Sequence, residues 1–344
     1  MWRFVLAVSL LCCSSDASVT CKDENGGQVD WFILYKAPYQ RGQLTGLEYI
    51  YIGPDKVLRR NSKLINDPRG ILANTLRPIF TSTMPKDFGF ISYSDQPPDG
   101  RSVSNTHGHS KGVLMVDKTG DQGVWLLHST PRFPLRDQNI FWPNGGAANA
   151  QTFICVTFKY DQFRAIGKHL QYIGAFPFDH HIPDSFHKEL KDARDGVRLP
   201  PVSTFQSLTS RGGQLFGSIA KQQSNIVTVG DLYVSIASLP EVNSDLYVQT
   251  WLERSGTPAK SFCPPQGKKV QNIESIHVTG LGEWERTKDH SKWCVATDQN
   301  RPWTCIADVN RADSQFKRRG GALCIMDKDI TDTFSLFVMR AELC

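Results

Sequence analysis

The sequence predicts an α/β fold of two pseudo-symmetric halves, each a mixed β-sheet flanked by helices, around a shared central cleft. Short runs of aromatic and β-branched residues alternate with segments of helical spacing, which indicates strands mixed with helices. A chain of 344 residues is long enough for two domains or one duplicated unit. The pattern His-Ser-Lys, five residues and Asp occurs at 109–117 and again at 290–298. Duplication of a half-molecule explains this repeat.

The first 17 residues carry the features of a signal peptide. Arg3 supplies a positive charge, residues 4–13 form an apolar run, and Ser15 and Ala17 are small residues that suit a cleavage site. No later stretch approaches the ~20 apolar residues that a membrane-spanning helix needs. We therefore predict a signal peptide over 1–17, entry into the secretory pathway and no membrane partner.

Two halves follow, the first over 18–200 and the second over 201–344, because each contains one copy of the motif. Strands are predicted from β-branched and aromatic runs, helices from apolar spacings of three and four, and loops from clusters of Gly, Pro and Ser. The predicted strands are 31–36, 47–53, 88–94, 152–160, 231–239, 244–252 and 333–343; the helices are 161–174, 183–194 and parts of 202–223; the loops are 95–105, 141–150, 195–213 and 255–269.

Each copy of the motif opens a predicted β-hairpin. Residues 108–131 and 289–311 both consist of a strand, a polar turn and a second strand. The second strands lead to His128 in one copy and Asn310 in the other, 19 and 20 residues after the motif histidines. Because a hairpin returns these side chains beside its first strand, we expect His128, Asn310 and the adjacent Arg311 to support the motif residues.

The two His-Lys pairs have the chemistry of a phosphodiester-cleaving site. Residues i and i+2 of a strand project from the same face, which brings His109 beside Lys111 and His290 beside Lys292. A lysine binds phosphate oxygens, and a histidine attacks phosphorus or delivers a proton. Two pairs face to face supply a nucleophile, a proton donor and charge stabilisation, so no metal or other cofactor is expected. A solvated surface pair is the alternative for either motif taken alone.

Other polar residues fit this site less well. Eight residues of strand span about 26 Å, so Asp117 and Asp298 cannot reach their own histidines and are predicted to lie in turns. His107 and the histidines within 179–187 offer a metal site, but no third ligand has a characteristic spacing, and we predict no metal. The basic clusters are candidates for phosphate contacts without sequence readout, or for solvated loops, at 317–321, 267–269 and 59–60.

The cysteine count indicates disulfides. Seven cysteines follow residue 17, so an oxidising compartment should bridge most of them and leave at least one free. The sequence alone does not choose among the pairings, and the absence of a CxxC pattern disfavours structural zinc. The net charge of +5 is mildly basic, which suits a polyanionic partner without requiring one.

Blocks of sequence spread over the whole chain after the signal peptide resemble the deoxyribonuclease II family. This family belongs to the phospholipase D-like superfamily, whose members pair two His-x-Lys motifs. The superfamily places four residues between Lys and Asp, whereas this chain has five, which again sets the two aspartates apart. The matching blocks are VDWFILYK, TGLEYIYI, GHSKGVLMVD, HSTPRFP, CVTFKY, DHSKWCV, WTCIADVNR and GGALCIMD.

The resemblance implies a metal-independent endonuclease that cuts double-stranded DNA at acid pH and leaves 3′-phosphate ends. A histidine of this family is expected to form a covalent phosphohistidine. We assign His109 as the nucleophile and His290 as the acid and then the base, with the reverse assignment left open. Lys111 and Lys292 are expected to bind the scissile phosphate.

The resemblance also implies a pairing of the cysteines. The expected disulfides are Cys21–Cys155, Cys263–Cys344 and Cys305–Cys324, with Cys294 free.

Two rival functions remain at this stage. The first keeps the machinery but acts on a phospholipid or another phosphodiester, and the second is a DNA-binding protein that has lost catalysis. The protein is expected in the lysosome or outside the cell, as a monomer with an internal pseudo-dimer or as a homodimer.

Overall fold

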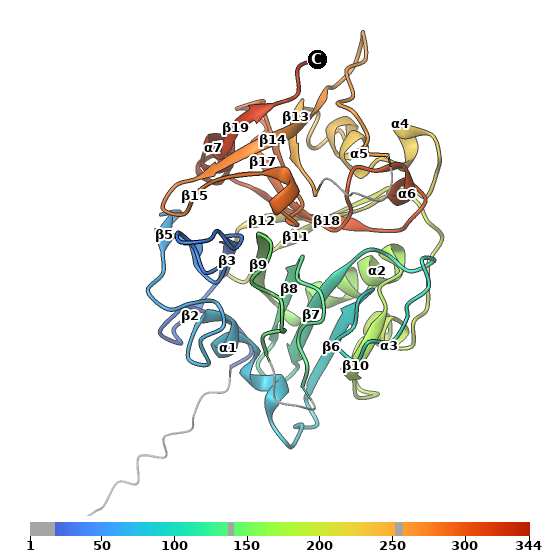
Figure 1. Cartoon of the computed structure of the whole chain (residues 1–344). Helices are drawn as coiled ribbons and strands as arrows, with labels where there is room; N and C mark the ends of the chain where they lie inside the picture. The colour runs from blue at the N-terminus through green and yellow to red at the C-terminus, as the bar shows by residue number, and fades with distance from the viewer. Residues whose placement is uncertain (1–17, 137–140, 252–256) are drawn as a thin grey trace, which may run out of the picture.

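The computed structural model describes residues 18–136, 141–251 and 257–344, so the predicted signal peptide lies outside the described residues. Two large β-sheets make up most of the fold, and a ribbon of β1 (Cys21–Lys22) and β2 (Gln28–Val29) precedes them. The first sheet fills the lower half of Figure 1 and the second sheet the upper half. Within the described residues, no helix has the length and apolar character needed to cross a membrane.

The first sheet has eight strands drawn from residues 31–181. Every neighbouring pair in it is antiparallel, so the mixed sheet expected for this half is an antiparallel one. In spatial order the strands are β10 (Pro177–His181), β6 (Phe88–Ser94), β7 (Lys111–Asp117), β8 (Gln122–His128), β9 (Gln151–Phe158), β3 (Trp31–Lys36), β4 (Tyr49–Ile52) and β5 (Arg59–Arg60).

The second sheet has nine strands drawn from residues 204–341. It is mixed, because β13 and β14 run parallel while its other pairs are antiparallel. In spatial order the strands are β11 (Thr204–Thr209), β12 (Leu215–Ala220), β18 (Gly321–Met326), β17 (Trp303–Ala307), β16 (Trp293–Ala296), β13 (Leu246–Gln249), β14 (Val270–Val278) and β15 (Gly282–Glu285), and β19 (Val338–Ala341) also pairs with β14.

Each sheet contains a run of four antiparallel strands with the same topology. The run is β6–β7–β8–β9 in the first sheet and β13–β16–β17–β18 in the second. In each run a His-x-Lys motif lies at the start of the second strand, in agreement with the predicted hairpins. Outside these runs the connections differ, since the next two strands follow the order β3–β4 in one sheet and β12–β11 in the other. Symmetry of the whole halves stays a prediction.

Few helices accompany the sheets, and α1 lies against one face of the first sheet while α5 lies against the second. The α-helices are α1 (Ile71–Leu76), α2 (Phe163–Ile173), α3 (Lys188–Arg194), α4 (Val227–Gly230), α5 (Leu232–Ser238), α6 (Asp313–Phe316) and α7 (Lys328–Leu336), and the 3₁₀ turns are Arg77–Phe80, Tyr160–Gln162 and Arg286–Lys288.

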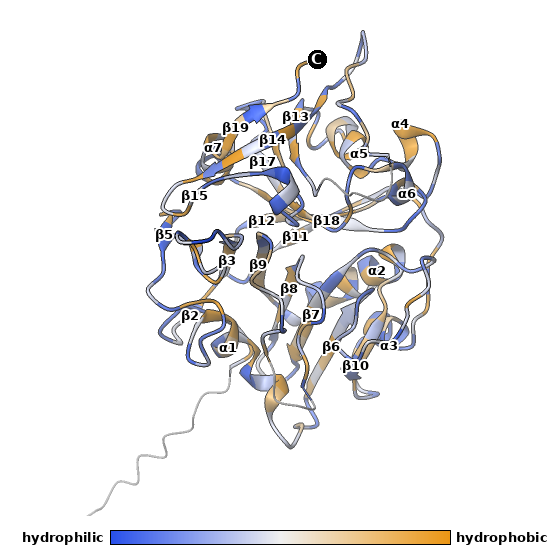
Figure 2. Ribbon diagram, viewed as in Figure 1, coloured by the Kyte–Doolittle hydropathy of each residue, from blue (hydrophilic) through white to orange (hydrophobic). Residues whose placement is uncertain are grey.

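A single hydrophobic core joins the two sheets. It contains Ile33 and Trp125 from the first sheet together with Trp293 and Leu323 from the second. The opposite face of the first sheet packs on α1 and that of the second on α5, so both sheets are buried on two faces. Strands buried on both faces lack the alternation of a half-exposed strand, and the interiors of β7 and β8 are apolar between polar residues at their ends. Figure 2 shows hydrophobic residues within the strands and helices and many hydrophilic ones in the connecting loops.

Most of the predicted elements are confirmed. Five predicted strands correspond to β3, β4, β6, β9 and β13, and two predicted helices to α2 and α3, with ends that differ by a few residues. Residue 252, at the end of one predicted strand, and residues 255–256, at the start of one predicted loop, lie outside the described residues.

Three segments were predicted wrongly. Residues 231–239 form α5, because the Asp231 carboxylate accepts hydrogen bonds from the backbone N–H groups of Tyr233 and Val234 and caps a helix. Residues 202–223 form β11 and β12 instead of a helix, so the loop predicted to extend to 213 also ends early. Residues 333–343 are divided between the end of α7 and β19.

The predicted disulfide pairing is confirmed. Cys21–Cys155 ties the N-terminal ribbon to β9, Cys305–Cys324 joins β17 to β18, and Cys263–Cys344 anchors the C-terminus. Cys294 is free and buried, and burial raises its pKa far above the ordinary range of a thiol. A thiol of that kind is inert, as expected for a core residue.

Candidate active site

The first His-Lys pair meets on a single carboxylate. Lys111 begins β7 directly opposite Ser94, the last residue of β6, so Asp95 lies at the same end of the sheet. The His109 Nδ1 atom lies 2.7 Å from one Asp95 oxygen, and Lys111 Nζ lies 2.6 Å from the other. Because Nδ1 donates to the carboxylate, the lone pair of Nε2 stays free for chemistry.

Burial governs the charges of this pair. The Asp95 and Lys111 side chains are each 4% exposed and that of His109 is 14% exposed. Burial alone would raise the pKa of Asp95, but the charges of Lys111 and His109 outweigh it and hold that pKa well below its usual range. Burial lowers the pKa of His109 to about 4, against the opposing effect of Asp95. The carboxylate therefore stays ionised throughout the pH range in which the histidine titrates.

The second half of the chain contributes an arginine to this first pair. Arg318 Nη2 lies 3.2 Å from the Asp95 carboxylate, and Arg318 Nη1 lies 3.2 Å from His109 Nδ1. The backbone N–H of His109 donates to the Arg319 carbonyl at 3.1 Å. The position of the first histidine is thus fixed by residues on both sides of the boundary between the halves.

The second His-Lys pair is held by a residue of the first half. The backbone N–H of His290 donates to the carbonyl of Ala150, in the first half, at 3.0 Å. The His290 ring packs on Trp251 with ring centroids 4.1 Å apart, and Lys292 Nζ donates to the His290 carbonyl at 2.8 Å. Unlike His109, His290 has no carboxylate bonded to its ring among the described residues.

A buried polar cluster lies beneath this second motif. The Asp289 carboxylate accepts hydrogen bonds from the Tyr35 hydroxyl at 2.5 Å and from Trp284 Nε1 at 2.7 Å. Its other oxygen accepts from the Ser291 backbone N–H at 2.8 Å, and Trp293 Nε1 donates to the Tyr35 hydroxyl at 3.1 Å. Tyr35 belongs to β3 of the first half, so this cluster fixes the second motif across the boundary.

The two pairs lie close enough to change each other's ionisation. Burial and then the charges of Lys292 and Lys111 lower the pKa of His290 to about 3. Lys292 in turn acts on His109, and burial together with the charge of Lys111 lowers the pKa of Lys292 to about 7. The fold therefore brings together the four motif residues that the sequence singled out, although they are about 180 residues apart in the chain.

His128 lies beside the first pair as the hairpin predicted. Gly112 pairs with Leu127, which places His128 across from Lys111. Both ring nitrogens of His128 are buried, without a hydrogen bond of good geometry to a described residue, and the ring packs between Phe133 and Phe153. Burial and the charge of Lys111 lower its pKa to about 3. A neutral imidazole beside Lys111 is the result.

The second hairpin is not equivalent at this position. Trp293 pairs with Ile306, and the Ala307 N–H donates to the Lys292 carbonyl at 2.8 Å, so Ala307 is the residue across from Lys292. Asn310 lies three residues further along, buried, with its Oδ1 atom unpartnered. The neighbouring Asp308 is buried, and burial raises its pKa to about 8 while the charges of both motif lysines oppose that rise.

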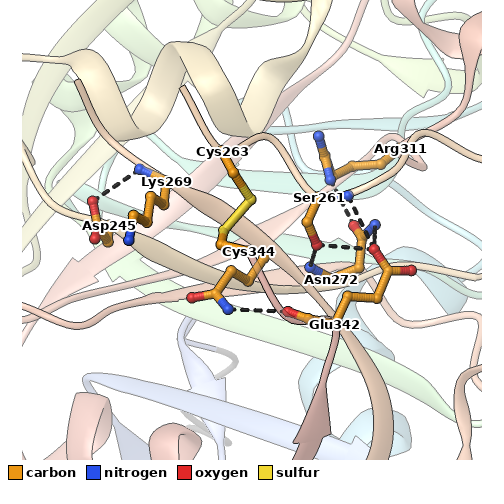
Figure 3. The surroundings of a disulfide bond; sticks show 9 residues. Asp245, Ser261, Cys263, Lys269, Asn272, Arg311, Glu342 and Cys344 are labelled. Carbon is orange, nitrogen blue, oxygen red and sulfur yellow. Dashed lines mark hydrogen bonds between the residues drawn. A yellow bond between two sulfur atoms is a disulfide. The ribbon is translucent and has the colours of Figure 1, made fainter. Parts of the chain in front are cut away.

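Arg311 is held inside the second half. Its Nε donates to the buried Asp231 carboxylate at 2.8 Å, and its Nη1 donates to Asn272 Oδ1 at 2.6 Å. Figure 3 shows how Asn272 continues this network through Glu342 to Ser261, next to the Cys263–Cys344 disulfide. The Arg311 side chain is 1% exposed, and its charge is used in bonds that hold α5 and the C-terminal segment together.

The aspartates that end the repeated pattern border turns: Asp117 is the last residue of β7, and Asp298 follows β16 by two residues. Asp117 accepts a hydrogen bond from the backbone N–H of Gly120, and Asp298 accepts one from that of Asn300. His107 contacts the Arg198 guanidinium through Nε2 at 2.6 Å, and His187 stacks on Tyr160. Across 18–136, 141–251 and 257–344, no group of three or more His, Cys, Asp or Glu side chains is arranged to hold a metal ion.

Three carboxylates of the site were missed by the sequence reasoning. Asp95 lies in a predicted loop, Asp289 directly precedes a motif histidine, and Asp308 directly follows a strand. Only the position of Asp95, one residue past a strand that pairs with the motif strand, was available as a signal. Arg318 was included in the basic cluster 317–321, but nothing in the sequence connected that cluster with Asp95.

Comparison with known families places this site in context. The family model described as Deoxyribonuclease II matches residues 20–344. The chain belongs to the deoxyribonuclease II family. Deoxyribonuclease II proteins have the phospholipase D-like fold, and family membership supports a nuclease that hydrolyses DNA as the class of activity.

Individual relatives cover almost the whole chain. Plancitoxin-1 of Acanthaster planci is 34% identical over 95% of this chain and 93% of its own length. Deoxyribonuclease-2-alpha of Sus scrofa is 33% identical, covering 95% and 91%, and deoxyribonuclease-2-beta of Homo sapiens is 31% identical, covering 95% and 92%. A solved polyphosphate kinase of Porphyromonas gingivalis matches 65% of this chain and 31% of its own, at 10% identity and a TM-score of 0.33, too low to bear on the fold.

Proposed function

We propose that this chain is an acid endodeoxyribonuclease that hydrolyses double-stranded DNA without a metal, through a phosphohistidine, to 3′-phosphate ends. The observation that carries the proposal is the meeting of the two His-Lys pairs at the boundary between the halves, where the His109 N–H donates to the Arg319 carbonyl and the His290 N–H to the Ala150 carbonyl. In keeping with this proximity, the charge of Lys111 lowers the pKa of His290 and that of Lys292 lowers the pKa of His109. Groups that interact in this way can act on one phosphate.

His109 is the proposed nucleophile because of its bond to Asp95. That bond fixes the imidazole with Nδ1 protonated, so Nε2 attacks phosphorus and forms the N–P bond as the bond to the 5′ oxygen breaks. The departing oxygen takes a proton from His290. His290 then removes a proton from water, whose oxygen attacks phosphorus and breaks the N–P bond, which leaves phosphate on the 3′ end and a protonated His290.

The positive charge of the site is the proposed means of stabilising the phosphorane. The charges of Lys111 and Lys292 both act on the two histidines, and these lysines contribute charge without a change of coordination during the reaction. Lys292 is fully protonated only below its pKa of about 7, so its contribution is present in acid and is lost as the pH rises through that value.

Acid activity follows from the histidines as well. Burial and the lysine charges lower the pKa of both His109 and His290, to about 4 and about 3, so a cationic histidine forms only in acid. A bound phosphodiester adds a negative charge, which offsets the lysines and moves both values upward in the complex. The alkaline limb of the pH profile of kcat/KM, which reports the free enzyme, is therefore expected below pH 6.5, the ordinary pKa of histidine, and the limb of kcat, which reports the complex, at a higher pH than that of kcat/KM.

Location and assembly are also proposed. Three disulfides and relatives named deoxyribonuclease-2 support a lysosomal or extracellular protein. The shared core and the contacts between the halves suit a monomer that contains a complete site, and a homodimer of such units is the alternative.

A plasmid-nicking assay at acid pH in excess EDTA tests this function. We expect supercoiled DNA to be nicked, and the new ends to resist extension by a polymerase until a phosphatase removes the 3′-phosphate. The matched control is His277→Ala, an exposed histidine on β14, which should cleave like the wild type, whereas His109→Ala should not cleave. Loss of activity in EDTA with recovery on adding a divalent ion would refute the metal-independent mechanism, and cleavage of a phospholipid alone would favour the rival substrate.

A further inference from the structure

A polar cavity of about 630 Å³ lies at the boundary between the halves, next to the first His-Lys pair. Asn105 and Thr106 line it from the first half, and a segment of the second half that includes α6 completes it. Arg318 belongs both to this cavity and to the first pair, since its guanidinium contacts Asp95 and His109. One side chain therefore joins the cavity to the proposed nucleophile.

Several polar groups of the cavity have no partner within the part of the chain that the structure describes. Gln315 is 6% exposed, and its buried Oε1 atom accepts no hydrogen bond there. The Nε atom of Arg318 is likewise buried and unpartnered, and the ammonium group of exposed Lys317 makes no ion pair with a described residue. Buried donors and acceptors are normally satisfied, so unpartnered ones beside a cavity indicate a place for a polar ligand.

The charge of the cavity favours an anion. Two cations, Lys317 and Arg318, and one carboxylate, Asp313, line it. Next to it Arg198 donates to the Thr106 hydroxyl at 3.1 Å, which adds a third cation at the rim. The Nη1 and Nη2 atoms of Arg318 already contact His109 and Asp95, so the donors left for a ligand are the Nε–H of Arg318, the Lys317 ammonium and the Gln315 NH₂ group. Cationic and amide donors of this kind bind phosphate oxygens.

We propose that this cavity binds a phosphodiester group of the DNA strand that neighbours the scissile phosphate, with Lys317, Arg318 and Gln315 as its ligands. The inference rests on the proposed nuclease function. The scissile phosphate itself belongs to Lys111 and Lys292, so the cavity serves the next phosphate along the same strand. Such a contact positions the strand and carries no sequence information.

The test uses Lys317→Ala, because Lys317 is exposed and has no part in the catalytic pairs. Each phosphate contact contributes about 0.9 to the slope of log K against log salt, so losing one should flatten the slope of log kcat/KM on DNA by about 0.9. Between 50 and 200 mM salt, this difference amounts to about 3.5-fold less inhibition by salt. On bis(4-nitrophenyl) phosphate, which has no neighbouring phosphate, the variant should equal the wild type.

The matched control is Lys86→Ala. Lys86 is exposed like Lys317 but precedes Phe88, at the end of β6 that is roughly 20 Å from Asp95, so its removal should leave the DNA salt slope unchanged. Lys317→Glu should lower kcat/KM on DNA further than alanine does.

The outcomes separate this inference from the proposed function. A wild-type protein that cleaves DNA, combined with a Lys317→Ala variant whose salt slope equals that of the wild type, would refute the phosphate subsite alone. A wild-type protein that does not cleave DNA would refute the proposed function. Equal loss by Lys317→Ala on both substrates would also refute the subsite, because it would place Lys317 at the scissile phosphate.

Discussion

His169 should weaken the folded protein in the acid range where the proposed enzyme works. It lies on α2 with no exposed surface, its ring centroid is 5.1 Å from that of Trp125, and neither ring nitrogen has a hydrogen-bond partner among the described residues. Burial lowers its pKa to about 3, whereas the unfolded chain titrates near 6.5. Because the folded pKa lies below the unfolded one, this group destabilises the fold as pH falls from about 6.5, and the cost reaches its limit near pH 3.

The magnitude follows from these two values. At pH 4.5 the solution is two units below the pKa of the unfolded histidine while the folded one is still neutral, so the cost is about 3 kcal/mol, against well under ~1 kcal/mol at pH 7. His169→Gln cannot ionise. Between pH 7 and pH 4.5 its free energy of unfolding should therefore fall by roughly 2–3 kcal/mol less than that of the wild type.

Urea unfolding at the two pH values measures this difference. His277→Gln, the exposed histidine on β14, is the control and should follow the wild type at both pH values. Equal losses of stability in wild type and His169→Gln would refute the reasoning, because they would mean that the buried imidazole is protonated as readily as in the unfolded chain.

Four further predictions concern the site. His109→Ala and His290→Ala should each lower kcat by at least ~10³-fold, and the double variant should lose little more; losses that multiply would exclude a shared site. On a nitrophenyl phosphodiester, whose leaving group needs little protonation, His290→Ala should recover activity relative to DNA; if His109→Ala recovers instead, the roles are exchanged. Asp95→Asn should lower kcat by ~10²-fold or more and move the acid limb of the pH–rate profile to lower pH, because the carboxylate raises the pKa of His109. An unchanged profile would show that Asp95 does not influence the ionisation of His109. Burial raises the Asp308 pKa to about 8, so the wild type should lose stability as the pH rises from about 4 to 8, and Asp308→Asn should not show this loss. Urea unfolding curves that do not change between pH 5 and pH 7.5 in either protein would contradict this.

The sequence predicted the parts of the fold in which local pattern and tertiary structure agree. The motif hairpins are confirmed because a polar turn between two apolar runs specifies a hairpin whatever packs on it. Residues 231–239 were misread since their apolar residues suit a strand as well as a helix, and only the capping bonds of Asp231 decide between them. The division of 333–343 between α7 and β19 likewise depends on pairing with β14, a contact across more than 50 residues of chain.

The motif residues of the site were predictable, but their supporting groups were not. His109 and Lys111 share a face in the repeated pattern, whereas Asp95 joins them through the register of β6 and β7, which no local signal specifies. Arg311 shows that proximity in sequence does not place a side chain in the same cluster. It is adjacent to Asn310, yet its guanidinium is directed to Asp231, 80 residues earlier in the chain.

The row of cysteines across the second sheet has a consequence for oxidative folding. Cys305 on the middle strand β17 has Cys324 opposite it on β18 and Cys294 opposite it on β16. A residue on an antiparallel strand forms a close, non-hydrogen-bonded pair with one neighbour and a wider, hydrogen-bonded pair with the other. The Cα atoms of Cys305 and Cys324 are 3.9 Å apart, so theirs is the close pair and sheet register favours this bridge, while Cys294 is a competing thiol on the wider side. A thiol left next to a disulfide in this way is also the group by which the two competing bridges interconvert, through thiolate attack and release of the third sulfur, so burial of Cys294 keeps the finished protein from reshuffling.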